Sequence, residues 1–202
     1  MTSRLLRCLD VLLAFSGLLF GAPLFLLLWL LGKACIGAPL FRQVRVGWRQ
    51  QPFVLVKFRT MRPGTASVAS HLADPAAIPS WGRFLRRTKL DELPQLWNVL
   101  KGEMSLVGPR PCLFSQETLI AERAARGVFN VRPGITGLAQ TRGIDMSTPE
   151  LLAQTDASML ASLGLAAYFR YIFLTIAGKG AGDSVRARDD GDKNSPPPSG
   201  SP

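Results

Sequence analysis

Two adjacent carboxylates, Asp91 and Glu92, are the side chains of this sequence whose types and spacing best suit chemistry. A short run of cations precedes them, namely Arg83, Arg86, Arg87 and Lys89. An ionised acid surrounded by cations can hold a divalent metal ion and a phosphate group, because Mg²⁺ binds carboxylate and phosphate oxygens. The start of an ordinary solvated helix has the same local pattern. The carboxylate pair alone therefore leaves a functional and a purely structural interpretation open.

An apolar repeat predicts that the carboxylates lie at the start of a helix. Apolar residues recur at steps of three and four, the spacing of one buried helix face, at Leu90, Leu93, Leu96, Trp97 and Leu100. Thr88 and Asp91 form a weak capping-box pattern, and Pro94 suits the first turn of a helix. The positive end of the helix dipole should keep carboxylates ionised there. Gly102 is a typical C-terminal signal, so the helix should end near it.

Two further cations, Lys57 and Arg59, come from a β-hairpin that we predict over residues 39–62. Residues 40–46 and 53–58 have strand-like patterns, and the residues between them have turn chemistry. Because side chains alternate along a strand, Lys57 and Arg59 should lie on one face and could converge on one anion. A solvated strand face is the alternative.

Two loops have the chemistry to approach a phosphate. Arg110 lies between Pro109 and Pro111, so its planar guanidinium is presented by a stiff loop and suits a phosphate or a uracil-type edge. A plain surface turn is the alternative. Residues 130–140 contain glycines, a proline and an arginine, which could let backbone N–H groups approach an anion. Their order matches neither a P-loop nor a dinucleotide fingerprint.

The composition favours a membrane rather than nucleic acid as the partner of the basic charge. The chain of 202 residues has a net charge of +10, yet 47% of its residues are hydrophobic. Anionic lipids attract Lys and Arg, whereas a nucleic-acid binder should also show a recognition helix or an aromatic platform. The odd number of cysteines, Cys8, Cys35 and Cys112, lacks metal-ligand spacing and indicates free thiols in a reducing compartment, the cytoplasm.

An uncharged apolar run over residues 11–31 is long enough to cross a bilayer. Basic residues flank it on both sides, with Arg4 and Arg7 before it and Lys33, Arg42, Arg45 and Arg49 after it. A simple span should have one flank poorer in Lys and Arg. Pro23 lacks an N–H and clashes with the preceding turn, so the helix should bend there. We therefore predict a re-entrant helix that turns at Ala22 and Pro23 and leaves on the same side; a straight span and a signal peptide are the alternatives.

The remaining segments are expected to support the site. Residues 115–126 should form a short surface helix, and a second helix should run from 147–150 to about 161. The aromatic segment 165–177 suits either the lipid headgroup plane, with its tyrosines at the interface, or a core helix. His71 lies in a loop rich in Pro, Ala, Ser and Gly and is expected to be incidental, and the tail is expected to be disordered.

These motifs, in this order, resemble the bacterial sugar transferases, and more specifically the small monotopic polyprenyl-phosphate phosphoglycosyl transferases. The resemblance is carried by the stretches Phe41–Gly47, Lys57–Met61, Gly82–Asn98, Val107–Pro111 and Arg132–Gln140. It covers about residues 4–180, and the chain length is similar to that of the minimal catalytic form.

The resemblance implies a reaction. Members of this family transfer a phospho-sugar from a UDP-sugar to undecaprenyl phosphate, release UMP, require Mg²⁺ and start surface glycan or glycoconjugate assembly on the cytoplasmic face of the bacterial inner membrane. It implies that Asp91 is the nucleophile that forms a covalent phospho-sugar intermediate and that Glu92 holds Mg²⁺. It also implies that Arg110, beside Pro111, meets the nucleotide or its phosphate. The other residues that would shape the anionic site are Lys57, Arg59 and Arg86.

The sequence departs from the family pattern in two places. The membrane turn of the family is commonly Ser-Pro, whereas this chain has Ala22 and Pro23. After Gln140 the family usually reads Val-Asn-Gly-Arg, whereas this chain continues with Thr141, Arg142, Gly143 and Ile144. The resemblance therefore implies no role for that second loop, which could bear on the choice of sugar.

The expected fold is α+β, a mostly helical monotopic membrane protein with a Pro-bent re-entrant helix, a small β-hairpin and interfacial amphipathic helices. We expect a membrane anchor over 1–36, a cytoplasmic transferase domain over 37–180 and a disordered tail over 181–202. A catalytically inactive basic membrane scaffold that binds phospholipid or polyprenyl phosphate is the alternative function. The sequence leaves open the sugar, the glycan pathway, the oligomeric state and the division of roles between Asp91 and Glu92.

Overall fold

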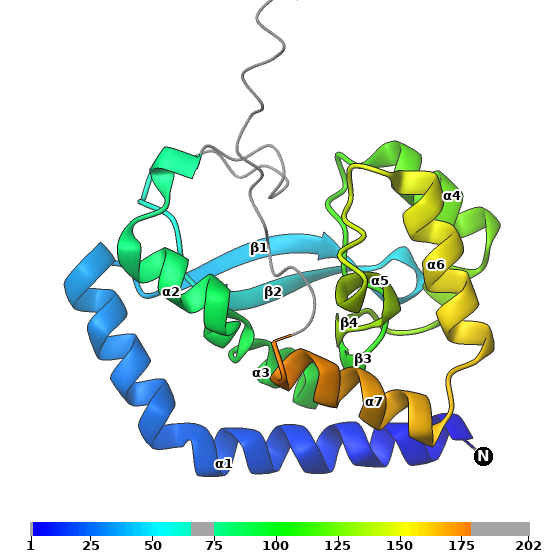
Figure 1. Ribbon diagram of the computed structural model, residues 1–202, viewed down its shortest axis with the longest axis horizontal. Coiled ribbons are helices and arrows are strands. Elements are labelled where there is room, and N and C mark those ends of the chain that lie inside the picture. Colours follow the sequence, from blue (N-terminus) through cyan, green and yellow to red (C-terminus); the bar gives the residue numbers. More distant parts are fainter. Residues whose placement is uncertain (1, 66–74, 179–202) are drawn as a thin grey trace, which may run out of the picture.

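The computed structural model describes residues 2–65 and 75–178, and it has the expected α+β, mostly helical architecture (Figure 1). The predictions for His71 and for the tail over 181–202 lie outside the described residues. The main helices are α1 (Thr2–Ile36), α2 (Ser80–Thr88), α3 (Gln95–Lys101), α4 (Glu117–Ala125), α5 (Leu138–Thr141), α6 (Pro149–Ala161) and α7 (Leu165–Ile176). The strands are β1 (Leu40–Val46), β2 (Pro52–Phe58), β3 (Ser105–Val107) and β4 (Gly134–Thr136). Short 3₁₀ turns are η1 (Trp48–Gln50), η3 (Pro75–Ala77), η4 (Leu90–Glu92) and η5 (Val128–Asn130).

Helix α1 is long, apolar and bent. Among the described residues, one helical segment, Arg4–Ile36, is long and apolar enough to cross a membrane by length and composition. Figure 1 shows α1 following one edge of the molecule and then turning sharply, and Pro23 lies inside it. A proline removes a helix hydrogen bond and clashes with the preceding turn, which explains the bend. The predicted bend is thus present, while its placement in a membrane stays a prediction.

The inner face of α1 belongs to the same hydrophobic cores as the rest of the protein. Ala14 packs in one cluster with Phe53 and Val99, and Leu28 packs in another with Phe58 and Leu85. Other side chains of α1 remain exposed although they are large and apolar, among them Leu12, Phe15, Leu19, Phe20, Leu26 and Leu30. An exposed apolar surface of this kind marks an interaction site. Helix α1 is therefore integral to the packing of the protein, and the predicted domain division stays a prediction.

Strands β1 and β2 form the predicted antiparallel hairpin, with Phe41 opposite Lys57 and Arg45 opposite Phe53. The face of β1 that points inward carries the polar side chains Gln43 and Arg45. Arg45 donates to Gln43 Oε1 from Nε at 2.9 Å and from Nη2 at 2.6 Å, so these buried polar groups satisfy each other. The outward face of the hairpin is apolar instead.

The segment around the carboxylates differs from the single helix start that we predicted. Helix α2 ends at Thr88, Lys89 adopts a left-handed conformation (φ 57°), and the 3₁₀ turn η4 intervenes before α3. Thr88 Oγ1 donates to the carbonyls of Phe84 and Leu85, so it closes α2 and the predicted capping box is wrong. Helix α3 does end at Gly102, which is left-handed (φ 84°) as expected for a C-terminal glycine.

The apolar repeat also divides between two cores rather than forming one face. Leu90 and Leu93 pack beside Leu28 and Phe58, whereas Leu96 and Leu100 pack beside Val99. Trp97 is 55% exposed, so its predicted burial is wrong. The change of backbone direction at η4 turns successive apolar residues toward different neighbours.

The glycines of the loop at 130–140 allow another segment of the protein backbone, at Gly108, to approach closely; the predicted ligand at this position was an anion. Strands β3 and β4 pair in parallel, with Val107 opposite Thr136, and Gly108 crosses closely over Gly134. A Cβ atom on Gly134 would lie 2.0 Å from Gly108 N, and the Gly134 N–H donates to Pro109 O at 2.8 Å. The predicted anion approach at this loop is therefore wrong for Gly134, because its space and its N–H are already used.

Helix α7 combines the two alternatives that the sequence left open. Tyr168 and Tyr171 are buried in a core with Met159, so the tyrosines do not lie at the surface as an interfacial helix would have them. Phe169 and Phe173 are exposed on the opposite side. One side of α7 is a core face, and the other is an apolar surface.

Candidate active site

Asp91 and Glu92 are both buried, with 3% and 7% of their surface exposed, in the turn η4. The left-handed Lys89 ends α2 just before this turn, and Pro94, which lacks an N–H, precedes the first residue of α3. The two carboxylates are therefore fixed by backbone breaks on both sides. Burying an ionised carboxylate is costly unless a cation or hydrogen bonds compensate it.

Arg110 provides that compensation for Glu92. Its Nη2 atom lies 2.8 Å from Glu92 Oε1, and 24% of the arginine side chain remains exposed. The tertiary structure thus joins two predicted site residues that come from separate motifs. Charge-assisted contacts of this kind are among the stronger hydrogen bonds in proteins, and the guanidinium has further donors for another anion.

Lys89 belongs to the same charged group. Burial lowers the pKa of Lys89, the neighbouring Glu92 opposes that shift, and Arg110 adds to it. The sequence placed Lys89 only in a basic run and gave it no role in the site. Its position directly before the carboxylate motif is the signal that could have identified it.

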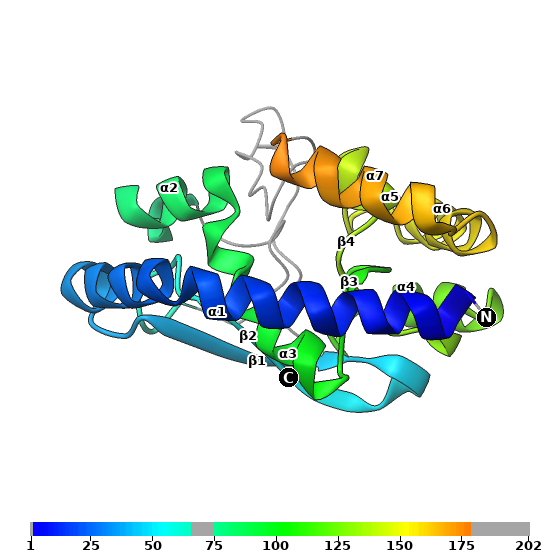
Figure 2. The ribbon, with the colours of Figure 1, turned by 90° about the horizontal axis from the view of Figure 1, so that it is seen from below.

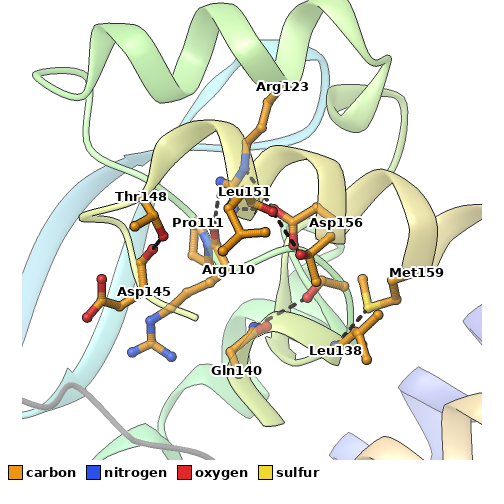
Figure 3. Close-up of polar contacts among 12 residues, drawn as sticks. Arg110, Pro111, Arg123, Leu138, Gln140, Asp145, Thr148, Leu151, Asp156 and Met159 are labelled. Atoms are coloured by element: carbon orange, nitrogen blue, oxygen red, sulfur yellow. Dashed lines mark hydrogen bonds and ion pairs between the residues drawn. The ribbon is translucent and has the colours of Figure 1, made fainter. Parts of the chain in front are cut away.

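A buried ion pair holds the loop that presents Arg110. Arg123 donates to Asp156 Oδ2 from Nε at 3.0 Å and from Nη2 at 2.6 Å, and both side chains are almost completely buried. Its remaining Nη1 atom donates to the carbonyl of Arg110 at 2.8 Å. Figure 3 shows the guanidinium of Arg110 pointing away from this pair. Burial raises the pKa of Asp156, and Arg123 opposes that shift.

The hairpin holds the other side of the same loop. Arg45 Nη1 donates to the carbonyl of Pro111 at 3.2 Å, and the N–H of Val46 donates to the carbonyl of Cys112 at 2.9 Å. Pro111 is buried and acts here through its backbone. Neither Arg123 nor Asp156 nor Arg45 was assigned to the site from the sequence, because nothing local identifies their partners.

Lys57 and Arg59 do lie on one face, as predicted. Lys57 Nζ is 5.7 Å and the Arg59 guanidinium carbon is 5.4 Å from the centre of the Phe41 ring. Arg59 also donates to the carbonyls of Ala38 and Leu40, which ties it to the start of β1. Strand β2 packs against η4, so Lys57 belongs to an element that contacts the carboxylate turn.

Arg86 connects α2 to the end of the hairpin, since its Nε atom donates to Thr60 Oγ1 at 2.9 Å. The close approach requires Gly82, where a Cβ atom would lie 1.9 Å from the carbonyl oxygen of Thr60.

Pro23 is exposed on α1 and lines neither of the two large pockets described below. The structure thus connects η4 with Arg110 and Lys89, while Pro23 lies apart from them in α1.

Two apolar pockets flank η4 and α3. The first, which we call the α7 pocket, has a volume of about 320 Å³. It is lined by Lys89 and Glu92 and by the apolar residues Leu93, Leu96, Leu106, Ile135, Ile172 and Ile176. The second, the hairpin pocket, has a volume of about 600 Å³. It lies between α1, the outward face of the hairpin and α3, with Phe25, Trp29, Arg42, Val54, Trp97 and Lys101 in its lining. Of the two, the α7 pocket reaches a candidate catalytic residue.

The carboxylate pair fits a magnesium ion that is bound together with a phosphorylated substrate. Within residues 2–65 and 75–178 no group of three or more His, Cys, Asp or Glu side chains could hold a metal ion. Mg²⁺ usually keeps several waters and takes one or two protein carboxylates plus substrate phosphates, rather than a complete protein cage. Asp91 and Glu92 supply that number of carboxylates.

Comparison with known proteins gives consistent matches. Residues 1–179 match the sequence model of a family described as bacterial sugar transferase. The chain is 50% identical over 109 residues to the uncharacterized sugar transferase EpsL of Bacillus subtilis, which covers 54% of each chain. It is 44% identical over 161 residues to a UDP-glucose:undecaprenyl-phosphate glucose-1-phosphate transferase of Caulobacter vibrioides, covering 75% of this chain and 60% of that protein.

A third relative matches over more of its own length. The exopolysaccharide production protein ExoY of Sinorhizobium fredii is 35% identical over 188 residues, which cover 84% of this chain and 83% of that protein. For the first two relatives, by contrast, the matched region spans between half and two thirds of their length.

Proposed function

The chain belongs to the bacterial sugar transferase family, and we propose that it transfers a phospho-sugar from a UDP-sugar to undecaprenyl phosphate or a similar polyprenyl phosphate and releases UMP. The observation that carries the proposal is the buried Asp91–Glu92 turn with Arg110 in contact with Glu92. A relative of known donor and acceptor, the Caulobacter transferase, supports the same substrate classes.

The proposed reaction has two steps at one phosphorus atom. A carboxylate oxygen of Asp91 attacks the phosphorus that bears the sugar, and the bond to the UMP oxygen breaks, so that UMP leaves with the electron pair. An oxygen of the acceptor phosphate then attacks the aspartyl phospho-sugar, forms the lipid diphosphate and restores the carboxylate. Neither attack needs a proton to be removed, because both nucleophiles are anions.

The cations of the site allow anions to approach one another. Arg110 neutralises Glu92 in the protein alone, and its partly exposed guanidinium would also bind a donor phosphate oxygen. Lys57, Arg59 and Arg86 would add positive charge around the diphosphate. Arg123 and Asp156 are positioning residues, because they hold the carbonyl of Arg110.

We assign Mg²⁺ to Glu92, with Asp91 kept for the attack. When bound, the ion would neutralise the diphosphate and stabilise the developing charge on UMP. The test of this division is a pair of variants. Asp91→Asn should abolish the adduct at every Mg²⁺ concentration, whereas the loss in Glu92→Gln should be partly recovered at high Mg²⁺. Recovery in Asp91→Asn instead would reverse the two roles.

The direct test of the function is the covalent adduct. Purified protein incubated with a panel of UDP-sugars and Mg²⁺ should gain the mass of a phospho-sugar and release UMP, and Asp91→Asn should do neither. If no donor produces an adduct or UMP, the proposal fails and an inactive membrane scaffold takes its place.

We further propose that α1 anchors the protein in the bacterial inner membrane with the catalytic part on the cytoplasmic face. The bend of α1, its exposed apolar side chains and the basic residues on both flanks support this arrangement. Tags on the N terminus and on the tail should both report the cytoplasm. A periplasmic N terminus with a cytoplasmic tail would show a straight span instead.

A further inference from the structure

We propose that the α7 pocket holds the first isoprenoid units of the polyprenyl phosphate acceptor, with the Lys89 ammonium group binding its phosphate. This inference rests on the proposed function and adds to it where the acceptor binds and which residues select it.

The apolar lining of the α7 pocket suits the lipid acceptor better than the UDP-sugar donor. Its apolar walls come from η4 and α3 (Leu93 and Leu96), from the β3–β4 pair (Leu106 and Ile135) and from α7 (Ile172). A UDP-sugar is polar along its whole length and would lose hydration against such walls. The lining also contains Thr88, Thr136 and Thr175, but their hydroxyls already bond to groups of the protein. A polyprenyl phosphate has one anionic end and a hydrocarbon tail, so its tail suits these walls.

The polar end of the pocket lies at the carboxylate turn, where Glu92 is part of the lining and Asp91 is the residue before it in the chain. Lys89 and Glu92 line the pocket, and Lys89 is close enough to Glu92 and Arg110 for both to influence its pKa. A phosphate bound to the Lys89 ammonium would therefore lie beside the carboxylate turn. The isoprenoid tail would then extend away from it along the apolar walls.

The pocket also leads toward an apolar surface on which the rest of a long lipid tail can continue. Ile176 lines the pocket and is 79% exposed at the end of α7, so the pocket opens at the protein surface. Residues of α1, including Leu9 and Leu13, pack in the core cluster that contains Tyr168 and Tyr171 of α7. Figure 1 shows α7 above the N-terminal arm of α1, and Figure 2 shows the two helices separated, so the shared core cluster connects them rather than a direct helix contact.

The hairpin pocket is larger but less suitable for this substrate. Arg42 and Lys101 could meet an anion there, yet its lining contains neither Asp91 nor Glu92. A phosphate bound at either of those cations would not face the nucleophile. The hairpin pocket therefore provides a control site of similar apolar character.

The test separates the two half-reactions. Ile172→Trp should fill the α7 pocket, and Ile176→Asp should place a charge at its mouth. For both variants the burst of UMP and the aspartyl adduct should form from the UDP-sugar, while the KM for undecaprenyl phosphate should rise about tenfold, which corresponds to about 1.4 kcal/mol of lost binding. The advantage of undecaprenyl phosphate over farnesyl phosphate should shrink in the same variants.

Two matched variants control for general effects. Phe173→Asp removes an exposed apolar residue of α7 that does not line the pocket, and Val54→Trp fills the hairpin pocket. Both should keep the wild-type KM for the acceptor. Lys89→Met should raise that KM for both chain lengths, because it removes the phosphate contact, and Lys89→Arg should restore part of it.

The outcomes distinguish the two proposals. A wild-type protein that forms no adduct and releases no UMP would overturn the proposed function itself. Normal adduct formation together with an unchanged acceptor KM in Ile172→Trp and Ile176→Asp would overturn only the α7 pocket. A rise in KM in Phe173→Asp equal to that in Ile176→Asp would also overturn it, because the effect would then belong to the membrane surface.

Discussion

The protein contains two arginine–carboxylate pairs that meet at one residue and have different surroundings. In the Arg123–Asp156 pair both side chains are almost completely buried, and two arginine nitrogens bind one carboxylate oxygen. In the Arg110–Glu92 pair the arginine is partly exposed, and Glu92 also lines the α7 pocket. Arg123 in turn binds the carbonyl of Arg110. The closed pair thus fixes the loop, whereas the open pair remains accessible to a ligand through the partly exposed arginine and the pocket beside Glu92.

The comparison teaches that pairing alone does not identify a catalytic charge. Arg123 and Asp156 are enclosed by protein and line neither of the two large pockets, so this pair supports structure, and removing one partner leaves an uncompensated charge. When an arginine–carboxylate pair lines a pocket, either charged group can replace its protein partner by a charged group of a substrate. The two pairs should therefore respond differently to substitution, one in stability and the other in catalysis.

The largest effect is expected for the closed pair. Arg123→Met should lower the free energy of unfolding by about 3–5 kcal/mol, because Asp156 would remain buried without its cation. Urea denaturation measures this loss. The double variant Arg123→Met with Asp156→Leu should lose less than the sum of the single changes, and strictly additive losses would contradict the pairing.

Glu92→Gln should reduce the rate of adduct formation by about two orders of magnitude, because it removes charge that supports several kcal/mol of transition-state stabilisation. The stability of the fold should change little, since the amide has nearly the same shape. Glu122→Gln provides the control, because Glu122 pairs with Arg126 at the partly exposed end of α4. A similar loss of rate in both variants would argue against a special role of Glu92.

Arg110→Ala should have an intermediate effect, mainly on the donor. Loss of one charge-assisted hydrogen bond corresponds to about 1.5–3 kcal/mol, so the KM for the UDP-sugar should rise about tenfold to a hundredfold. The folded protein should be destabilised less than in Arg123→Met, because Arg110 is partly exposed whereas both members of the Arg123–Asp156 pair are buried. A large loss of stability with an unchanged KM would make Arg110 equivalent to Arg123.

The smallest effect is a pH dependence that involves Lys89. Since burial lowers the pKa of Lys89 below its usual value of 10.5, the ammonium group loses its proton earlier on a rising pH than an exposed lysine. Acceptor affinity should therefore fall as pH rises through the lowered pKa, before 10.5 is reached. The free energy of unfolding should rise with pH over the same window. The reason is that the unfolded chain, with its higher lysine pKa, binds more protons there than the folded protein.

Lys89→Arg should move the loss of acceptor affinity to higher pH, since an arginine stays protonated. The pH profile of the acceptor KM, compared with that of the donor KM, measures the shift. Identical profiles for the wild-type protein and Lys89→Arg would exclude Lys89 as the group that titrates.

The N-terminal arm of α1 contains a buried carboxylate whose partners no local pattern in the sequence identifies. Asp10 directly precedes the uncharged run, yet it is buried and accepts hydrogen bonds from Ser105 Oγ at 2.8 Å, the Leu106 N–H at 2.9 Å and the Tyr168 hydroxyl at 2.9 Å. These donors lie about a hundred or more positions away along the chain, so no periodic pattern indicates them. Asp10 joins α1 to β3 and α7, which contribute residues to the α7 pocket.

The sequence by itself determined the features that depend on near neighbours along the chain. Alternation and turn residues predicted the strands of the hairpin, Pro23 predicted the bend of α1, and Gly102 predicted the end of α3, because each reflects local backbone geometry. The motif around Asp91 and Glu92 also identified the family. Only the tertiary structure decided that Arg110 contacts Glu92, that Arg123 and Asp156 hold its loop, and that Lys89 shares a pocket with Glu92. A buried charge is tolerated only beside its partner, and the fold alone brings such distant partners together.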